Sequence, residues 1–354
     1  MNNFSRVRNL RLRVGIVGYG NLGRAAVHLL DMKRESWKTE GLELDLTCVL
    51  GRRGGLLVPG GLSCGALAEH GETGAPLDCF PGFDKGVNVE EILRGHQIDL
   101  LVEFTPTNKE TGEPGLTHIR QALKNGIHVT TGNKGPVLVA WKELSQLAWE
   151  QGVLLGIGCT TGGALPSLIA GREAMAGSEI SLVEGVLNGT TNFILSRMER
   201  DGIDYEVALK EAQRNGIAEA DPRMDVEGWD TAVKLTILTK VVMKGDLELK
   251  DVSVTGITGL TRQEIQHAQE TGHRIKLIGR AWRNGKKVRA SVAPEQVEAA
   301  HPFYAVAEKD KCVRYVSDTL GDLFISGGAS GPLSAAASAM RDVLCAWRTG
   351  LLAR

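Results

Sequence analysis

The sequence predicts an α/β protein that combines a Rossmann-type, doubly wound parallel sheet with a second, α+β domain. At 354 residues the chain exceeds the length at which one hydrophobic core keeps growing, so two domains are expected. A GxGxxG motif lies between a short apolar strand and a helix near the start of the chain. Strands then alternate with helices as far as residue 157, which is typical of a parallel sheet covered by helices.

The elements of the first part follow from apolar runs and helical periodicity. Residues 13–17 form a β-like run, and Ala26, Leu29 and Leu30 share one face of a helix over 24–32. Further strands are expected at 44–50, 98–104, 127–131 and 153–157, with helices at 116–125 and 137–150. Because ligands of a parallel sheet collect at the carboxyl ends of its strands, the turns after these strands are candidate sites.

The first such turn carries the glycine-rich motif. Glycines permit a tight turn and a close approach of pyrophosphate to the backbone, while the following helix N-terminus supplies amide donors and a favourable dipole. The alternative is a glycine turn without a ligand, which the order strand, motif, helix disfavours. The expected cofactor contacts here are Gly18, Tyr19, Gly20, Asn21, Leu22 and Gly23.

Two arginines follow the next strand. An NAD-preferring fold usually has an acid at this point for the ribose 2′-hydroxyl, whereas this chain has Arg52 and Arg53. Planar guanidinium groups match a 2′-phosphate, so the pair favours NADP over NAD. The alternative is a pair of solvated loop charges, and the upstream glycine motif favours the cofactor role.

Two later turns also fall at strand ends. Thr105 and Pro106 follow the third strand, and Lys134 lies in a glycine-proline turn after the fourth. All three are candidate cofactor contacts, and Lys134 is a candidate partner for the nicotinamide ribose or for substrate. By position alone, Lys134 fits an exposed turn lysine equally well.

The character of the chain changes beyond Pro136, and a small-residue helix that begins near Pro332 returns toward the pattern of the first part. We therefore expect a dinucleotide-binding domain over 1–136, completed by about 304–354, and a second domain over 137–303. Within the second domain, a helix near 228–243 places Asp230 and Lys234 one turn apart on one face, with apolar neighbours around the lysine. The alternative is an exposed helix pair worth about 0.3–0.5 kcal/mol.

Composition limits the partners and the location. A net charge of −1 gives no electrostatic footprint for nucleic acid or an anionic membrane, so small molecules are the expected partners. The sequence has no apolar run long enough to span a bilayer and no signal-peptide pattern, which leads us to expect a cytoplasmic protein. Its six cysteines form no CxxC pair and fit reduced thiols.

Several segments together resemble the homoserine dehydrogenase family. They occur in the family's order and span nearly the whole chain. The matching segments are 105–114, 128–136, 188–195, 218–222 and 225–235. The resemblance implies an NAD(P)-dependent oxidoreductase that interconverts L-homoserine and L-aspartate 4-semialdehyde in threonine and methionine biosynthesis. It also implies a homodimer whose middle domain carries the substrate site and the dimer sheet. Because the chain stops soon after the last helix, we expect no regulatory ACT domain and no threonine feedback through one.

The resemblance assigns roles to individual residues. Lys234 matches the catalytic lysine, which accepts the hydroxyl proton during oxidation and returns it during reduction, and which needs a lowered pKa to act as a base. Lys134 matches a second lysine at the hydride-transfer centre. Asp230 is expected to orient Lys234 or to bind substrate, and Glu219 and Asp225 to bind the substrate ammonium. Taken singly, these acids also fit solvated loop charges, and the Asn and Thr residues at 188–192 fit capping and turn roles.

Two departures from the family pattern bear on ligands. Gly158 stands where the family has a glutamate that binds a monovalent cation together with backbone carbonyls corresponding to Thr161, Gly163 and Leu165. Losing this carboxylate argues against the cation site, and Cys159 beside it is expected to serve packing.

The terminal glycine loop at 327–331 is also altered, which weakens the cofactor contacts expected at Ser330 and Gly331. These departures keep two alternatives open: a related NADP-dependent dehydrogenase for another amino or hydroxy acid, and a catalytically silent NADP-binding sensor.

Overall fold

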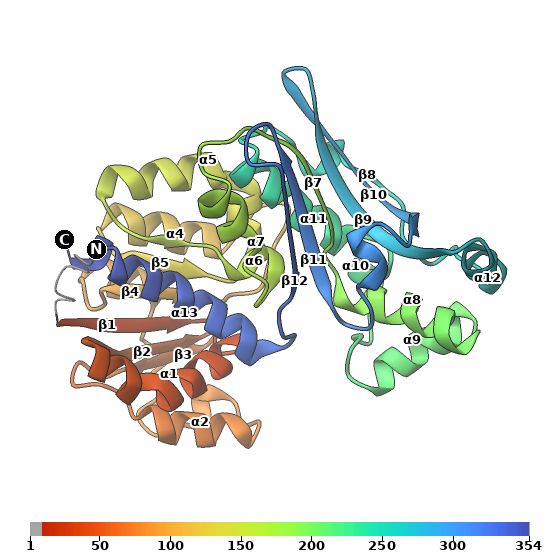
Figure 1. Cartoon of the computed structure of the whole chain (residues 1–354). Coiled ribbons are helices and arrows are strands. Elements are labelled where there is room, and N and C mark those ends of the chain that lie inside the picture. The colour runs from red at the N-terminus through yellow and green to blue at the C-terminus, as the bar shows by residue number, and fades with distance from the viewer. Residues whose placement is uncertain (1–8, 354) are drawn as a thin grey trace. The chain divides into compact units, whose positions relative to one another are not determined.

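The computed structural model describes residues 9–353, which divide into two compact units (Figure 1). The first unit contains the chain up to Thr160 and again from Gly331 onward, and the second contains Thr161–Ser330. The chain thus leaves the first unit once and returns to it with its last helix.

Six strands form the sheet in the described part of the first unit, in the order β3-β2-β1-β4-β5-β6. Neighbouring strands are parallel except at the β2–β3 hairpin, which confirms the predicted parallel sheet. The strands are β1 (Leu10–Val17), β2 (Leu42–Gly51), β3 (Gly54–Leu57), β4 (Leu100–Glu103), β5 (His128–Thr131) and β6 (Leu155–Gly156).

Helices cover both faces of this sheet, as a doubly wound fold requires. On one face, α1 (Asn21–Glu40) and α13 (Pro332–Arg348) lie side by side, red and blue in Figure 1, and share a core with Val14 and Ile16. On the other face, α4 (Gly115–Lys124) and α5 (Lys134–Gln151) share a core with the alternate strand residues, among them Leu101 and Val129. The remaining helices of this unit are α2 (Cys64–Glu72) and α3 (Val89–Arg94).

The second unit is built on a mainly antiparallel sheet of six strands within its described residues, in the order β12-β11-β7-β9-β10-β8. The strands are β7 (Ile180–Val186), β8 (Ser253–Val254), β9 (His273–Asn284), β10 (Lys287–Glu298), β11 (Lys311–Ser317) and β12 (Asp322–Gly327). Helix α11 (Trp229–Val242) lies against β7, β9 and β10. Gly279 permits this contact, because a Cβ there would stand 2.9 Å from Thr231 Cγ2.

Further helices complete the second unit. They are α6 (Cys159–Gly162), which crosses from the first unit, α7 (Ser167–Ile169), α8 (Gly189–Asp201), α9 (Tyr205–Arg214), α10 (Arg223–Val226) and α12 (Arg262–Glu270). Helices α8 and α12 pack on β9.

The boundaries between the units differ from those expected at 136 and 304. Helix α5 stays with the first unit because Leu144 and Ala148 are buried in its core. Strands β11 and β12 belong to the second unit, because β11 pairs with both β12 and β7. The first unit is completed from Gly331 onward and not from residue 304.

A buried carboxylate ties the second sheet together across three strands. Glu184 on β7 is 2% exposed and pairs with Arg280 on β9 and Arg314 on β11, each at 2.9 Å. His301 lies 3.4 Å from the same carboxylate. Removing one member leaves the others buried without their partner, which costs far more than removing an exposed ion pair.

We therefore expect Glu184→Ala to lower the free energy of unfolding by about 3–5 kcal/mol. Asp322→Ala is the matched control, because it removes a 47% exposed partner of the same Arg314 and should cost at most about 1 kcal/mol. Urea unfolding followed by circular dichroism compares the two. Equal losses would contradict the structural role given to Glu184.

Candidate active site

The glycine-rich loop of the first unit connects β1 to α1 and has the form of a nucleotide-binding turn. Gly18 has φ +102°, and a Cβ on it would stand 2.4 Å from the carbonyl oxygen of Phe104. A Cβ on Gly23 would stand 2.1 Å from the Gly18 carbonyl oxygen, so this glycine lets α1 pack on the loop. The space where a Cβ of Gly20 would stand has no described atom within 4 Å.

The first turn of α1 fits a pyrophosphate. Helix α1 begins after Gly20, which has no side chain to cap the first amides, so these donors remain for a ligand. Tyr19 does not share this role through its ring, because the side chain is buried and its hydroxyl donates to the Leu67 carbonyl at 2.8 Å. Asn21 is exposed and Leu22 half-buried beside the loop.

The two arginines after β2 differ in their surroundings. Arg53 pairs with Asp78 at 2.8 Å. Arg52 is exposed and forms no ion pair with any residue between 9 and 353. A ligand phosphate would therefore find one arginine available and the other already engaged.

A buried acid that sequence reasoning missed organises the turns after β4 and β5. Glu103 is 0% exposed, and it accepts hydrogen bonds from the Thr105 amide at 2.9 Å, the Thr105 hydroxyl and the Thr131 hydroxyl at 3.0 Å. Asn133 donates to the Thr105 hydroxyl at 3.2 Å. Burial raises the pKa of Glu103, and these donors oppose the rise. The sequence signal was an acid at the end of an otherwise apolar strand.

This network sets the position of Lys134. Asn133 caps α5 by accepting a hydrogen bond from the Gly135 amide at 3.0 Å, and Lys134 is the half-buried first residue of the helix. Cys159 lies near this turn and donates to the Thr131 carbonyl at 3.4 Å. Burial raises the pKa of the Cys159 thiol to about 12, which leaves a packing residue, as expected, rather than a nucleophile.

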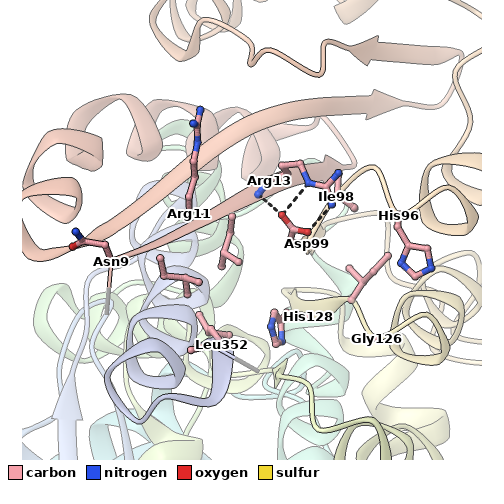
Figure 2. A pocket seen from close by; sticks show the side chains of 13 residues that line it. Asn9, Arg11, Arg13, His96, Ile98, Asp99, Gly126, His128 and Leu352 are labelled. Carbon is pink, nitrogen blue, oxygen red and sulfur yellow. Dashed lines mark hydrogen bonds and ion pairs between the residues drawn. The ribbon is translucent and has the colours of Figure 1, made fainter. Parts of the chain in front are cut away.

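A pocket of about 450 Å³ lies at the other end of the first sheet (Figure 2). It is lined by residues that precede or begin β1, β4 and β5, among them Arg13, Asp99 and His128. Arg13 holds Asp99 in an ion pair at 2.7 Å, and the Nδ1 of His128 accepts from the Leu154 amide. Because ligands of parallel sheets bind at the carboxyl ends, this pocket is not the cofactor site.

The second unit holds a compact polar cluster around Lys234 on α11. Lys234 Nζ lies 2.6 Å from Asp230 Oδ2 and donates to the Leu187 carbonyl at 2.9 Å. The Lys234 and Asp230 side chains are only 15% and 11% exposed. The pair is thus largely removed from solvent, which sets it apart from an ordinary exposed helix pair.

Asn188 joins this cluster to a second acid. Its amide nitrogen donates to Asp225 Oδ1 at 2.6 Å and to Asp230 Oδ2 at 2.9 Å, while its oxygen accepts from the Thr191 amide and caps α8. The capping role was expected, and the bridge between the two aspartates was not. Thr190 and Asn192 instead bind backbone carbonyls, in keeping with an architectural role.

The cluster does not include Glu219. That residue is exposed, and its backbone carbonyl accepts a hydrogen bond from Gln213 at 3.1 Å. The structure therefore brings together Asp225, Asp230 and Lys234, and leaves the Glu219 carboxylate in solvent.

Lys311 on β11 is a second buried lysine of this unit, which sequence reasoning missed. It is 8% exposed, and its Nζ donates to the Gly162 carbonyl at 3.2 Å. Burial and the positive charge of Lys234 lower the pKa of Lys311 to about 8, against the effect of Asp230. No local pattern marks it, because a lysine at the start of a strand is ordinarily exposed.

The remaining expected ligands lie in loops. The Leu165 carbonyl accepts from the Ser167 amide at 2.8 Å, and Gly163 has φ +61°. A Cβ on Gly158 would stand 2.5 Å from Asp342 Oδ1, so a side chain there would require the Asp342 carboxylate to move. Ser330 is exposed, and Gly331 precedes α13, which begins at Pro332 as predicted. Among residues 9–353 no group of His, Cys, Asp and Glu could hold a metal ion, and no helix could cross a membrane.

Comparisons with known proteins point to the same family as the matching segments of the sequence. The homoserine dehydrogenase family model matches residues 166–344, more than half of the chain. Homoserine dehydrogenase of Methanocaldococcus jannaschii is 34% identical over 93% of this chain and 96% of its own. The NAD(+)-dependent homoserine dehydrogenase of Pseudomonas canavaninivorans is 33% identical over 94% and 95%.

Solved structures of homoserine dehydrogenases are similar to this chain in fold. The homoserine dehydrogenase of Thiobacillus denitrificans superposes with a TM-score of 0.80 at 30% identity, covering 96% of this chain and 74% of that one. A hyperthermophilic archaeal homoserine dehydrogenase mutant in complex with NADPH has a TM-score of 0.80 at 23% identity, covering 95% and 97%. With the glycine loop in one unit and the lysine cluster in the other, these matches establish that the chain belongs to the homoserine dehydrogenase family.

Proposed function

We propose that this protein interconverts L-homoserine and L-aspartate 4-semialdehyde, with Lys234 as the proton-transferring residue. The observation that carries the assignment of Lys234 is its buried contact with Asp230 and the Leu187 carbonyl. When bound, the nicotinamide cofactor supplies or accepts the hydride. The protein must then move one proton to or from the substrate oxygen, and general acid–base catalysis of this kind contributes about 10²–10⁴-fold.

The geometry of Lys234 suits this proton transfer. A lysine ammonium has three N–H donors, and two are directed to Asp230 and the Leu187 carbonyl. The third is available for the substrate oxygen. During reduction of the semialdehyde, this N–H donates its proton as the alkoxide forms; during oxidation, the neutral amine takes the hydroxyl proton. Asp230, itself fixed by Asn188, acts as the positioning group for the amine.

Two acidic residues, Asp225 in the cluster and Glu219 outside it, are assigned to recognise the ammonium group of the substrate. Asp225 has one carboxylate oxygen engaged by Asn188, which leaves the other for the substrate ammonium. Glu219 is assigned the same task, and its exposed carboxylate fits a group that engages when substrate binds. Both assignments are supported by the family resemblance of 218–222 and 225–235.

On the cofactor side we assign contacts to the glycine loop and the turns after β4 and β5. The Glu103 network holds Thr105 and Asn133, and through them the start of α5 with Lys134. Pro106, Ser330 and Gly331 are assigned to the cofactor by family resemblance, and all three are exposed.

We further propose that the cofactor is preferentially NADP. A pyridine nucleotide follows from the family, and the preference rests on Arg52, which is exposed and free of an ion pair with the described residues. A guanidinium in that state can form a charge-assisted contact with a 2′-phosphate. Arg53 contributes less, because its guanidinium already pairs with Asp78.

A homodimer is proposed through the face of the second sheet that carries Glu184 and Arg280. Strand residues alternate between faces, so Arg280 points away from α11, which Gly279 contacts. A pocket of about 290 Å³ lies along this face, and Phe324 on β12 is 36% exposed. A partly exposed aromatic residue beside paired charges is typical of an association surface.

Lys234→Ala should strongly reduce turnover while the protein stays folded. We expect kcat for homoserine oxidation to fall by about 10²–10⁴-fold, measured by absorbance at the nicotinamide band with NADP and with NAD. Lys210→Ala, which removes an exposed lysine of α9, is the control and should keep the wild-type rate. Wild-type protein that binds NADP but turns over neither homoserine nor another hydroxy amino acid would favour the sensor.

Arg52→Gln should reduce discrimination for NADP. Loss of a charged hydrogen bond worth about 1.5–3 kcal/mol corresponds to a decrease of about 10- to 100-fold in kcat/KM for NADP, with little change for NAD. Arg53→Gln should have the smaller effect. If the double variant keeps the wild-type ratio of kcat/KM values for the two cofactors, NADP preference does not reside in these arginines.

Phe324→Glu should weaken the dimer, because it places a charge in the proposed interface. Light scattering coupled to size-exclusion chromatography should give about twice 38.0 kDa for the wild type and a mass near 38.0 kDa for the variant at low concentration. Leu333→Glu, on α13 of the first unit, is the control. A monomeric wild type would rule out the proposal.

A further inference from the structure

The loop that corresponds to the family's monovalent-cation site is contacted by a cationic side chain from another part of the second unit. Lys311 reaches from β11 to this loop, and its Nζ donates to the Gly162 carbonyl at 3.2 Å. The same nitrogen lies 3.5 Å from the point where a Cβ of Gly163 would stand. The ammonium group is therefore in contact with the segment Thr161–Leu165, whose carbonyls would be the ligands.

Other contacts already engage some of the oxygen atoms of this loop. The Leu165 carbonyl accepts from the Ser167 amide at 2.8 Å, and the Gly162 carbonyl also accepts from the Leu165 amide at 3.2 Å. The hydroxyls of Thr161 and Ser167 bind each other at 2.7 Å. One of the three expected ligand carbonyls, that of Leu165, is thus already hydrogen-bonded within the loop.

The carboxylate that would balance a bound cation is also missing. Position 158 is a glycine, and the Asp342 carboxylate lies where a side chain at that position would begin. Asp342 Oδ2 instead accepts from the Gly158 amide at 2.6 Å. The residues present do not fit a resident monovalent cation: the charged ligand is absent, and a protein ammonium contacts the loop.

We propose that the Lys311 ammonium replaces a monovalent metal ion at the 161–165 loop, so that the stability and turnover of this protein do not depend on Na⁺ or K⁺. An ammonium carries the same single positive charge, and Lys311 Nζ directs a donor at the Gly162 carbonyl, which lies between the expected ligand residues Thr161 and Gly163 in the chain. Its stem crosses the buried interior from β11, so the charge is covalently fixed.

The replacement also places a fixed charge beside the substrate cluster. Lys311 interacts electrostatically with both Lys234 and Asp230. A bound ion at this loop would exchange with solvent, whereas a lysine cannot leave. The inference concerns the loop and does not depend on which hydroxy acid is the substrate.

The test compares cations at constant ionic strength. Thermal unfolding and turnover of the full-length wild type are measured in choline chloride, NaCl and KCl after dialysis against a metal-free buffer. We expect the same Tm and the same kcat/KM in all three salts. Selective stabilisation or activation of the wild type by Na⁺ or K⁺ would overturn the proposal, with or without a folded variant.

Lys311→Met removes the charge and keeps the apolar stem. In choline chloride we expect its Tm to fall by several degrees, on the order of 5 °C, and Na⁺ or K⁺ to restore part of the loss because the loop then has no positive charge of its own. Lys309→Met, at an exposed position two residues earlier, is the control and should show neither effect. A Lys311→Met protein with wild-type Tm in choline chloride would also overturn the proposal. Because Tm is independent of the reaction, a failed activity assay and a failed cation inference are distinguishable.

Discussion

The polar cluster around Lys234 depends most on the hydrogen bonds of the Asn188 side-chain amide. This amide links two carboxylates, on α10 and α11, to the start of α8, and one of these carboxylates holds Lys234. Each of these groups is wholly or largely removed from water, so each needs a partner to offset its lost hydration. Substituting the asparagine would leave two neighbouring acids without their shared donor, and the position of the lysine would no longer be determined.

The first unit also positions its turns through one buried polar side chain, but this side chain accepts hydrogen bonds instead of donating them. There a single buried acid, Glu103, accepts several donors, and the turns after two strands follow its position. In both units a buried polar side chain makes its hydrogen bonds within the protein, and these bonds hold the neighbouring loop residues in place. Rigid placement of reacting groups matters because a proton donor misplaced by about 1 Å can cost about 10²-fold in rate.

Features with a local sequence pattern were predictable, and features that depend on distant pairing were not. The glycine motif, the alternation of strands and helices, the last helix and the pair Asp230–Lys234 follow from neighbouring residues. Strand β7 and its pairing with β11 join segments more than a hundred residues apart, so the strands after residue 304 were given to the wrong unit. Likewise, Asn188 has the pattern of a helix cap, and only the fold brings Asp225 and Asp230 to its free nitrogen. The partner of Arg53 and the burial of Lys311 have no local signature either.

The return of α13 to the first unit has a consequence for synthesis on the ribosome. The second unit is one continuous stretch of chain, so its sheet can form as soon as β12 has emerged. The first unit begins earlier but lacks one of its covering helices until α13 has been made, and Val14 and Ile16 lie on the face that this helix covers. During that interval an apolar sheet surface is open to solvent and to other nascent chains, so the domain whose synthesis starts first is the one that matures last.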